Sequence, residues 1–279
     1  WYSGEKLEDI SENADGKQVV YETDICTDQA CDFIRKNKES PFFLTLAYNA
    51  PHSPHITPTT GSYAGRPWGN YEKNYAAMIE FLDAGVGAVV QTVREAGLTS
   101  DTVIFVSSDH GPRSEPTAEQ TEVVDFFDSH GSLRGYKRDL YEGGIRVPLI
   151  VSWPGHIRAG STSDEPVYHP DFLPTAVGLA GNGRLYPDMD GVDISPVLLG
   201  HGEIATRYLY WETYEPSFWQ AARHGHWKAV KPVGGGRIQL FDLLKDPSET
   251  NDVSAENSAL VGSFEDYFKR CRVASPNYI

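Results

Sequence analysis

Two kinds of segment alternate between residues 24 and 181. Three short runs are continuously apolar, which is typical of buried strands: 41–51, 102–107 and 147–153. Three others carry apolar residues at steps of three and four, which predicts helices: 24–37, 70–97 and 171–181. We expect Asp24 to cap the first helix and Gly97 to end the second. Strands that alternate with helices of this length predict right-handed crossovers and a mostly parallel α/β sheet with helices on both faces.

The pattern changes after Gly200. Aromatic-rich, strand-like runs separated by turn residues follow, and a helical pattern covers 255–273. This predicts a small antiparallel α+β subdomain. We therefore assign residues 1–204 to the α/β domain and 205–279 to the subdomain. The polar stretch 1–24 shows no helix or strand periodicity, so we expect the chain to begin inside a domain.

Charge excludes some classes of partner. The chain of 279 residues has 24 Lys plus Arg against 39 Asp plus Glu, a formal charge of −15, which argues against nucleic acid or an anionic membrane as a partner. No stretch approaches the roughly 20 apolar residues of a membrane span. Residues 1–20 also lack the apolar core of a signal peptide, so the sequence itself does not encode a location.

The run 102–107 stops on Asp109, His110 and Gly111. Catalytic groups in α/β sheets gather in loops at the carboxyl ends of strands. An acid and an imidazole at such an end offer two ligands to a metal ion, and the glycine permits the turn that aims them inward. The alternative, an ordinary turn closed by an Asx-type hydrogen bond, stays open on these residues alone.

Two other loops carry candidate groups. Lys137 and Arg146 flank a glycine-turned loop in which Gly143 and Gly144 would allow close approach to a ligand, and a lysine binds anions as a point charge. A solvated basic loop is the alternative. His52 follows the run 41–51 between two prolines, which suits a rigidly held acid or base, although a lone histidine in a loop is more often structural.

Taken together, these segments resemble the type I sulfatases of the alkaline phosphatase superfamily. The resemblance rests on "NAPHSPH", "TVIFVSSDHG" and "GSLRGYKRDLYEGGIRVPLIVSWPG", and extends through "DFLPT", "DGVDISPVLLG", "QAARHGHWKAV" and "QLFDLLKDPSETNDV". It covers nearly the whole chain. It is strongest toward bacterial sulfatases of sulfated glycans, related to the N-acetylgalactosamine-6-sulfatase and arylsulfatase A group, and implies an alkaline phosphatase-like fold.

The resemblance implies a role for each candidate. It makes Asp109 and His110 metal ligands, Lys137 the group that holds the sulfate, and His52 the group that protonates the leaving oxygen. It implies Ca²⁺, with Mg²⁺ or another divalent ion as alternatives because Ca²⁺ prefers oxygen ligands to imidazole. It implies a sulfated carbohydrate or aryl sulfate ester as substrate and a periplasmic or secreted location. His130 and Arg146 are further candidates: the first for lining the substrate pocket or closing a turn, the second for binding substrate or bracing its loop.

The chain departs from the family pattern in its nucleophile. Sulfatases use a formylglycine made from Cys or Ser in a Cys/Ser-x-Pro/Ala-x-Arg motif, and a paired Asp-Asp completes their metal site. Neither motif occurs here: Cys26, Cys31 and Cys271 begin "CTDQA", "CDFIR" and "CRVAS". We therefore expect a C-terminal portion of a sulfatase that is inactive by itself. The alternatives are a phosphatase or phosphonate hydrolase of the superfamily, or a non-catalytic glycan-binding relative. The oligomeric state is left open.

Overall fold

The computed structural model describes residues 2, 3, 6, 7, 10–17, 19–114, 123–181, 189–215, 217–232 and 236–273. The chain divides into two compact units, Trp1–Thr102 and Val103–Ile279. The predicted division at residues 204 and 205 falls inside the second unit and stays a prediction.

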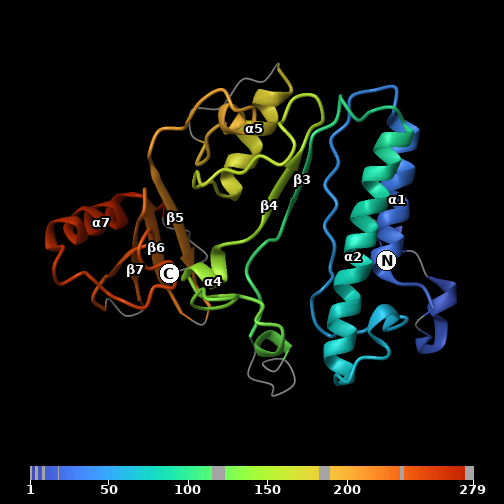
Figure 1. Cartoon of the computed structure of the whole chain (residues 1–279), viewed down its shortest axis with the longest axis horizontal. Coiled ribbons are helices and arrows are strands. Elements are labelled where there is room, and N and C mark those ends of the chain that lie inside the picture. Colours follow the sequence, from blue (N-terminus) through green and yellow to red (C-terminus); the bar gives the residue numbers. More distant parts are fainter. Residues whose placement is uncertain are drawn as a thin grey trace. The chain divides into compact units, whose positions relative to one another are not determined.

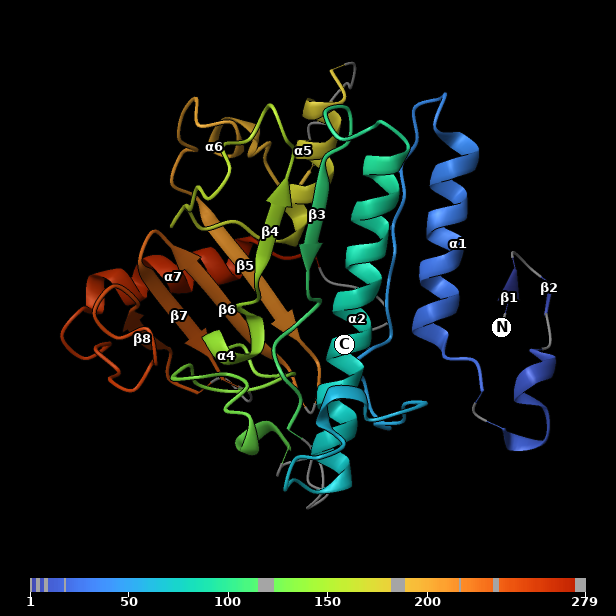
Figure 2. The same ribbon diagram turned by 45° about the vertical axis from the view of Figure 1, so that its right-hand side comes forward.

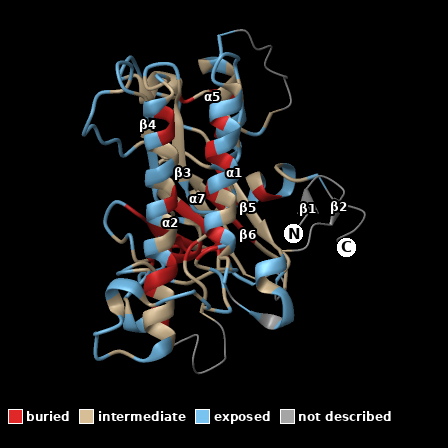
Figure 3. Cartoon of the chain, turned by 90° about the vertical axis from the view of Figure 1, so that its right-hand side faces the viewer, coloured by how far each residue is buried: buried red, intermediate tan, exposed pale blue. Residues whose placement is uncertain are grey.

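The first unit is built on two helices, α1 (Glu22–Asn37) and α2 (Asn70–Glu95). Both were predicted from their apolar spacing, and they lie side by side (Figure 1). Exposed residues cover much of each helix and buried residues form short bands on it (Figure 3). The predicted cap at Asp24 is wrong: α1 begins after Tyr21, and no side chain caps it. Gly97 ends α2 as predicted, with a φ of 75° that only glycine adopts without strain.

The remaining elements of the first unit are short. They are β1 (Tyr2–Ser3), β2 (Lys6–Leu7), η1 (Ser11–Gly16) and η2 (Gly61–Tyr63). The segment 41–49 forms no strand, contrary to the prediction, because it has no strand partner in the described part of the chain. Its residues alternate between exposed and half-buried, and Phe43 is 67% exposed. The period of two is that of an extended chain, but a strand also requires a hydrogen-bonded neighbour.

The second unit contains the two strands expected at 102–107 and 147–153. They are β3 (Ile104–Ser107) and β4 (Leu149–Ser152), which pair antiparallel with Ile104 opposite Ser152. The expectation that these strands belong to a parallel pairing is therefore wrong for this pair. A parallel pair needs a crossover, usually a long helix. The described parts of the connection instead hold turns, helical residues at 123–126 and α4 (Glu142–Ile145), and the chain returns along the neighbouring strand.

The C-terminal part of this unit is the predicted antiparallel α+β arrangement. Its strands follow one another in space as in sequence: β5 (Tyr208–Thr213), β6 (Trp219–His224), β7 (Trp227–Lys231) and β8 (Gln239–Asp242). Helix α7 (Ser258–Arg270) lies against this sheet (Figure 2). The shorter elements between β4 and β5 are η3 (His169–Asp171), α5 (Phe172–Leu179), which was predicted, and α6 (Ser195–Leu198).

Both faces of the sheet are buried. One face carries Ala222, Ala229 and Leu240, on which Phe264 and Phe268 of α7 pack. The alternate residues face the other way and pack on a second cluster: Ala221, Val230, Phe241, Leu243, Leu140 and Tyr141. Leu140 and Tyr141 come from the segment that leads into α4. The sheet is thus the support on which the segment around Lys137 rests.

Helix α2 is the one helix in the described ranges that is long and apolar enough to cross a membrane, judged by length and composition alone. The sequence analysis expected no such segment. A core helix of a soluble protein passes the same test, and α2 places Gly85 against Thr27 of α1 and Tyr48. This helix is therefore weak evidence for a membrane-spanning segment.

Candidate active site

Asp109 and His110 follow β3 directly, as the sequence predicts. The His110 backbone N–H donates to Asp109 Oδ1 at 3.0 Å. An Asx turn would instead use the N–H of Gly111, which donates to the Gly144 carbonyl, so this bond does not form the turn that the sequence left open as an alternative. This hydrogen bond does not involve Asp109 Oδ2 or His110 Nε2. Asp109 Oδ2 lies 3.2 Å from His110 Nε2, and the Asp109 side chain is 82% exposed.

The tautomer of His110 determines what this pair can bind. His110 Nδ1 lies 2.8 Å from the Gly111 carbonyl oxygen, so Nδ1 carries the proton that it donates. In the neutral ring, Nε2 then turns its lone pair toward Asp109 Oδ2. A cation bound by both atoms would relieve the repulsion across this 3.2 Å contact, and so would a proton on Nε2, which would make the two side chains an ion pair.

The metal-ligand set is incomplete within the described residues, where no group of three His, Cys, Asp or Glu side chains could hold a metal ion. Asp109 and His110 suit a divalent cation as two of its ligands. Ca²⁺ usually takes six to eight oxygen ligands and Mg²⁺ six, so two side chains leave most of either coordination shell to other groups.

Helix α4 brings the end of β3 against the loop of Lys137. Gly111 N–H donates to the Gly144 carbonyl at 2.9 Å, and Lys137 N–H donates to the Pro112 carbonyl at 2.7 Å. A Cβ at Gly111 would lie only 1.9 Å from the Gly143 oxygen, so no other residue fits without backbone movement. The structure thus joins two loops that are about 26 positions apart in sequence.

The two glycines of α4 approach the protein's own backbone and not a ligand. A Cβ at Gly143 would meet the Gly135 carbonyl at 2.3 Å, and a Cβ at Gly144 would meet the Tyr136 carbonyl at 2.3 Å. The interpretation of these glycines as ligand-approach positions is therefore wrong. They are required because the loop folds back on α4.

Lys137 is half-buried on this loop. Its ammonium group has no acidic partner in the described part of the chain. An ammonium group that no carboxylate neutralises is available to an anion, and it lies on the loop joined to Asp109 and His110.

His130 lies on the same loop with both ring nitrogens engaged. Nδ1 lies 2.8 Å from the Gly131 oxygen, and Nε2 lies 3.2 Å from the Tyr136 hydroxyl. Burial, with Asp125 as a nearby charge and hydrogen-bond partner, raises the pKa of Tyr136, so its hydroxyl stays protonated near neutral pH. These contacts favour the turn-closing alternative; the lining of a substrate pocket stays a prediction.

Arg146 contacts an acid of its own loop. Its Nη1 lies 4.0 Å from Glu142 Oε2, one turn away across α4, and its side chain is 58% exposed. The exposed portion leaves the guanidinium accessible, so binding of substrate by Arg146 also stays a prediction.

His52 lies in the first unit, whereas the other candidates lie in the second. The contacts described for His52 are therefore those within its own unit. Its backbone N–H donates to Asn49, and its Nδ1 lies 2.6 Å from the Ser53 oxygen. The ring is exposed, and Nε2 is the nitrogen left for another group. The peptide bonds before Pro51 and Pro54 are both cis.

The sequence analysis missed a buried ion network of Glu142, Lys228 and Glu249. Lys228 Nζ lies 2.9 Å from an oxygen of each glutamate, and Glu249 Oε2 accepts the Glu142 N–H at 2.6 Å. Lys228 and Glu249 are 0% exposed. The one available signal was that Lys228 shares a face of its predicted strand with the apolar Val230.

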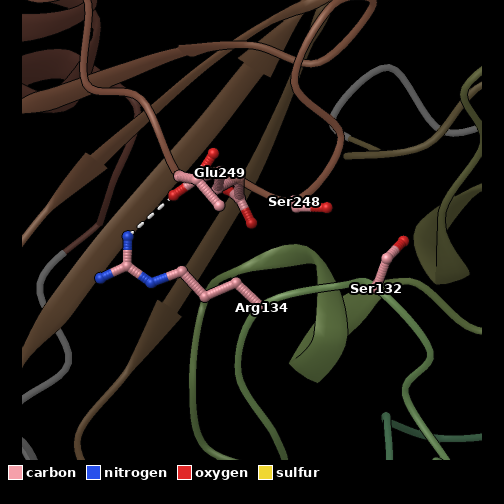
Figure 4. Close-up of a pocket in the computed structure, with 5 residues that line it drawn as sticks. Ser132, Arg134, Ser248 and Glu249 are labelled. Atoms are coloured by element: carbon pink, nitrogen blue, oxygen red, sulfur yellow. Dashed lines mark hydrogen bonds between the residues drawn. The ribbon is translucent and has the colours of Figure 1, made fainter.

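An open pocket of about 510 Å³ lies beside this network, lined by Ser132, Arg134, Ser248, Glu249 and Thr250. Figure 4 shows Arg134 reaching toward Glu249, where Nη1 donates to the Glu249 carbonyl at 2.9 Å. The guanidinium also lies 3.8 Å from the centre of the Tyr141 ring. The positive charge of Arg134 in this pocket is thus already engaged by groups of the protein itself.

Comparison with known proteins identifies two matching families. The family described as Sulfatase matches residues 1–182, and that described as N-sulphoglucosamine sulphohydrolase, C-terminal, matches residues 130–264. The steryl-sulfatase of Mus musculus is 33% identical over 260 residues, 82% of this chain and 40% of that protein. Arylsulfatase A of Homo sapiens is 34% identical over 243 residues, 77% of this chain and 44% of that protein.

Solved structures agree with these matches. The crystal structure of Ps i-CgsB has a TM-score of 0.79 and 30% sequence identity, and covers 91% of this chain and 55% of that chain. The same protein is solved in complex with k-i-k-neocarrahexaose. This likeness confirms the predicted fold class. The chain spans less than half the length of the curated relatives that it matches, and it belongs to the sulfatase family.

Proposed function

We propose that the protein containing this chain hydrolyses sulfate esters of carbohydrates. The observation that carries the proposal is that backbone hydrogen bonds of α4 join the loop of Lys137 to the turn that follows Asp109 and His110. A lysine ammonium that has no acidic partner in the described part of the chain, on a loop joined to a two-residue cation site, suits the singly charged sulfate group of an ester and the charge that develops on its ester oxygen. The carbohydrate class is supported by the likeness to Ps i-CgsB, which is solved with a neocarrahexaose.

The residues of this chain would divide the work as follows. Cleavage of the sulfur–oxygen bond leaves negative charge on the departing oxygen and on the sulfate group. Lys137 would bind the sulfate oxygens as a point charge. His52, with its Nδ1 proton held by the Ser53 oxygen, would donate a second proton from Nε2 to the departing oxygen.

Asp109 and His110 would hold a divalent cation, Ca²⁺ by family resemblance, with Mg²⁺ as the alternative. Such a cation, when bound, stabilises negative charge that develops during ester cleavage. Asp109 supplies a carboxylate oxygen, and the proton on His110 Nδ1 leaves Nε2 as a ligand. The exposed Asp109 side chain leaves room for the ligands that complete the shell.

The nucleophile would come from outside the residues of this chain. Cys26, Cys31 and Cys271 are free thiols, and none begins a formylglycine motif. Burial raises the pKa values of Cys26 and Cys271, which keeps both as unreactive thiols near neutral pH. The proposed reaction therefore belongs to the whole protein.

The proposal is tested on the full-length protein with a panel of sulfated monosaccharides, 4-nitrophenyl sulfate and 4-nitrophenyl phosphate. We expect divalent-ion-dependent release of sulfate from at least one sugar and a fall in kcat/KM of about 10²-fold or more in Lys137→Ala. Lys269→Ala, which removes an exposed lysine on α7, is the control. Release of phosphate but not sulfate would support the phosphatase alternative. Binding of the sugars without turnover would support the glycan-binding alternative.

A further inference from the structure

The buried ion network joins α4 to the C-terminal sheet. Glu142 begins α4, Lys228 lies on β7, and Glu249 follows β8. Their charged atoms meet at 2.9 Å, and all three side chains are nearly inaccessible to water. Arg223 Nη1, at 3.9 Å from Glu142 Oε2, brings a second positive charge. Arg146 Nη1, at 4.0 Å from the same oxygen, brings a third from a side chain that is 58% exposed. The two buried acids are thus neutralised by neighbouring cations, as buried charges require.

Glu249 holds the loop at two points. Its carboxylate accepts the N–H of Glu142, the first residue of α4. Its backbone carbonyl accepts the Arg134 guanidinium, three residues before Lys137. Glu249 therefore fixes both sides of the Lys137 loop, although it is 107 positions from Glu142 and 115 positions from Arg134 in sequence.

Helix α4 passes this constraint on to the proposed sulfate site. Gly143 N–H donates to the Arg134 carbonyl at 2.6 Å, and Gly144 accepts the N–H of Gly111 at 2.9 Å. The first bond closes the loop that bears Lys137, and the second fixes the turn that follows Asp109 and His110. Movement of α4 would therefore shift the lysine and the cation site relative to each other.

We propose that the buried ion network is a positioning device that sets Lys137 against Asp109 and His110. Glu249, Lys228 and Glu142 are its positioning residues, and they act through α4 without touching the substrate. The inference rests on the proposed function only for the anion that Lys137 binds, since the link from the network to the loop is a property of the fold.

The test uses the full-length protein carrying Glu249→Gln. Glutamine keeps the size of the side chain and an oxygen that accepts the Glu142 N–H, but it removes the charge that Lys228 faces. The matched control is Asp266→Asn, the same change of chemistry on an exposed acid that pairs with Lys269 at 3.1 Å on α7. Hydrogen exchange and kcat/KM are measured on both variants.

We expect amides of residues 134–146 to exchange faster in Glu249→Gln while amides of α7 keep their wild-type rates. We also expect kcat/KM to fall by about 10- to 100-fold, the range typical of residues that orient a binding group. This fall should be smaller in a Lys137→Arg background, because a positioning residue loses its effect when the group it positions is replaced. The Asp266→Asn control should match wild type in both measurements.

Two results would overturn the proposal: unchanged exchange in 134–146, or an equal fall in kcat/KM with and without Lys137→Arg. If Glu249→Gln does not fold, Arg134→Met replaces it, since this change removes the bond to the Glu249 carbonyl and the contact with the Tyr141 ring but leaves the charges of Glu142, Lys228 and Glu249 intact. If wild type hydrolyses no sulfate ester, the proposed function fails, and the exchange map alone decides the inference.

Discussion

Gly111 is the residue at which the turn after β3 touches α4. A methyl group there would lie 1.9 Å from the Gly143 oxygen, in contact with backbone that cannot rotate away. We expect Gly111→Ala to lower the free energy of unfolding by about 1–3 kcal/mol through overpacking, as measured by urea denaturation.

The matched control for this substitution is Gly262→Ala. Gly262 lies within α7, and nothing lies within 4 Å of a Cβ built there. The same change should leave stability unchanged or raise it by up to about 1 kcal/mol, because alanine favours the helix. Equal effects of the two substitutions would contradict the close contact at Gly111.

At this scale the sequence predicted the residues with local signals. Asp109 and His110 end a strand, and Lys137 lies on a glycine-turned loop, so residue type and position were enough to single them out. The backbone bonds that join them depend on contacts across the fold and have no local signature. Glu249 shows the same limit, because nothing in its surroundings in the sequence indicates that its carboxylate meets Glu142.

Among the elements, those whose pattern is local were predicted well. Helices α1, α2, α5 and α7 follow their apolar spacing to within a few residues. Strand pairing was less accessible, because its direction depends on the connection between strands. β3 and β4 pair antiparallel, and the apolar run 41–51 pairs with no strand in the described residues. Apolar content predicts an extended segment but does not specify its neighbour.

The segment between β8 and α7 is fixed by Asp252. Burial opposes ionisation of this acid, but bonds from the N–H of Leu240, from Ser254 and a nearby Arg237 outweigh it and lower the pKa of Asp252 below its ordinary value of 3.8. A lowered folded pKa gives stability that is present above the ordinary value and is lost as the pH falls through the lowered one.

We therefore expect Asp252→Asn to be less stable than wild type at neutral pH and to lose less stability on acidification. The measurement is the urea midpoint from pH 7 to pH 2, followed by circular dichroism. The variant should still lose part of its stability on acidification, because hydrogen bonds also lower the pKa of Asp246, which it keeps. Parallel curves for the two proteins across this range would refute the role of Asp252.

At the scale of the whole molecule, the chain spans only part of the length of the proteins that it resembles. The chain covers 55% of Ps i-CgsB and 40% of the mouse steryl-sulfatase. We expect the purified 279-residue chain to show no turnover of 4-nitrophenyl sulfate with Ca²⁺ or Mg²⁺, while the full-length protein is active. Metal-dependent hydrolysis by the isolated chain would contradict an external nucleophile. The periplasmic or secreted location stays a prediction that cell fractionation can check.

The bond between Glu142 and Glu249 also bears on how the protein is made. These residues are 107 positions apart, so the earlier one leaves the ribosome well before its partner has been synthesised. Contacts between distant positions form late, because the chain between them must first be ordered. We therefore expect the loop of Lys137 to stay incompletely ordered until the C-terminal sheet has folded, so that formation of β7 and β8 completes the proposed site during biosynthesis.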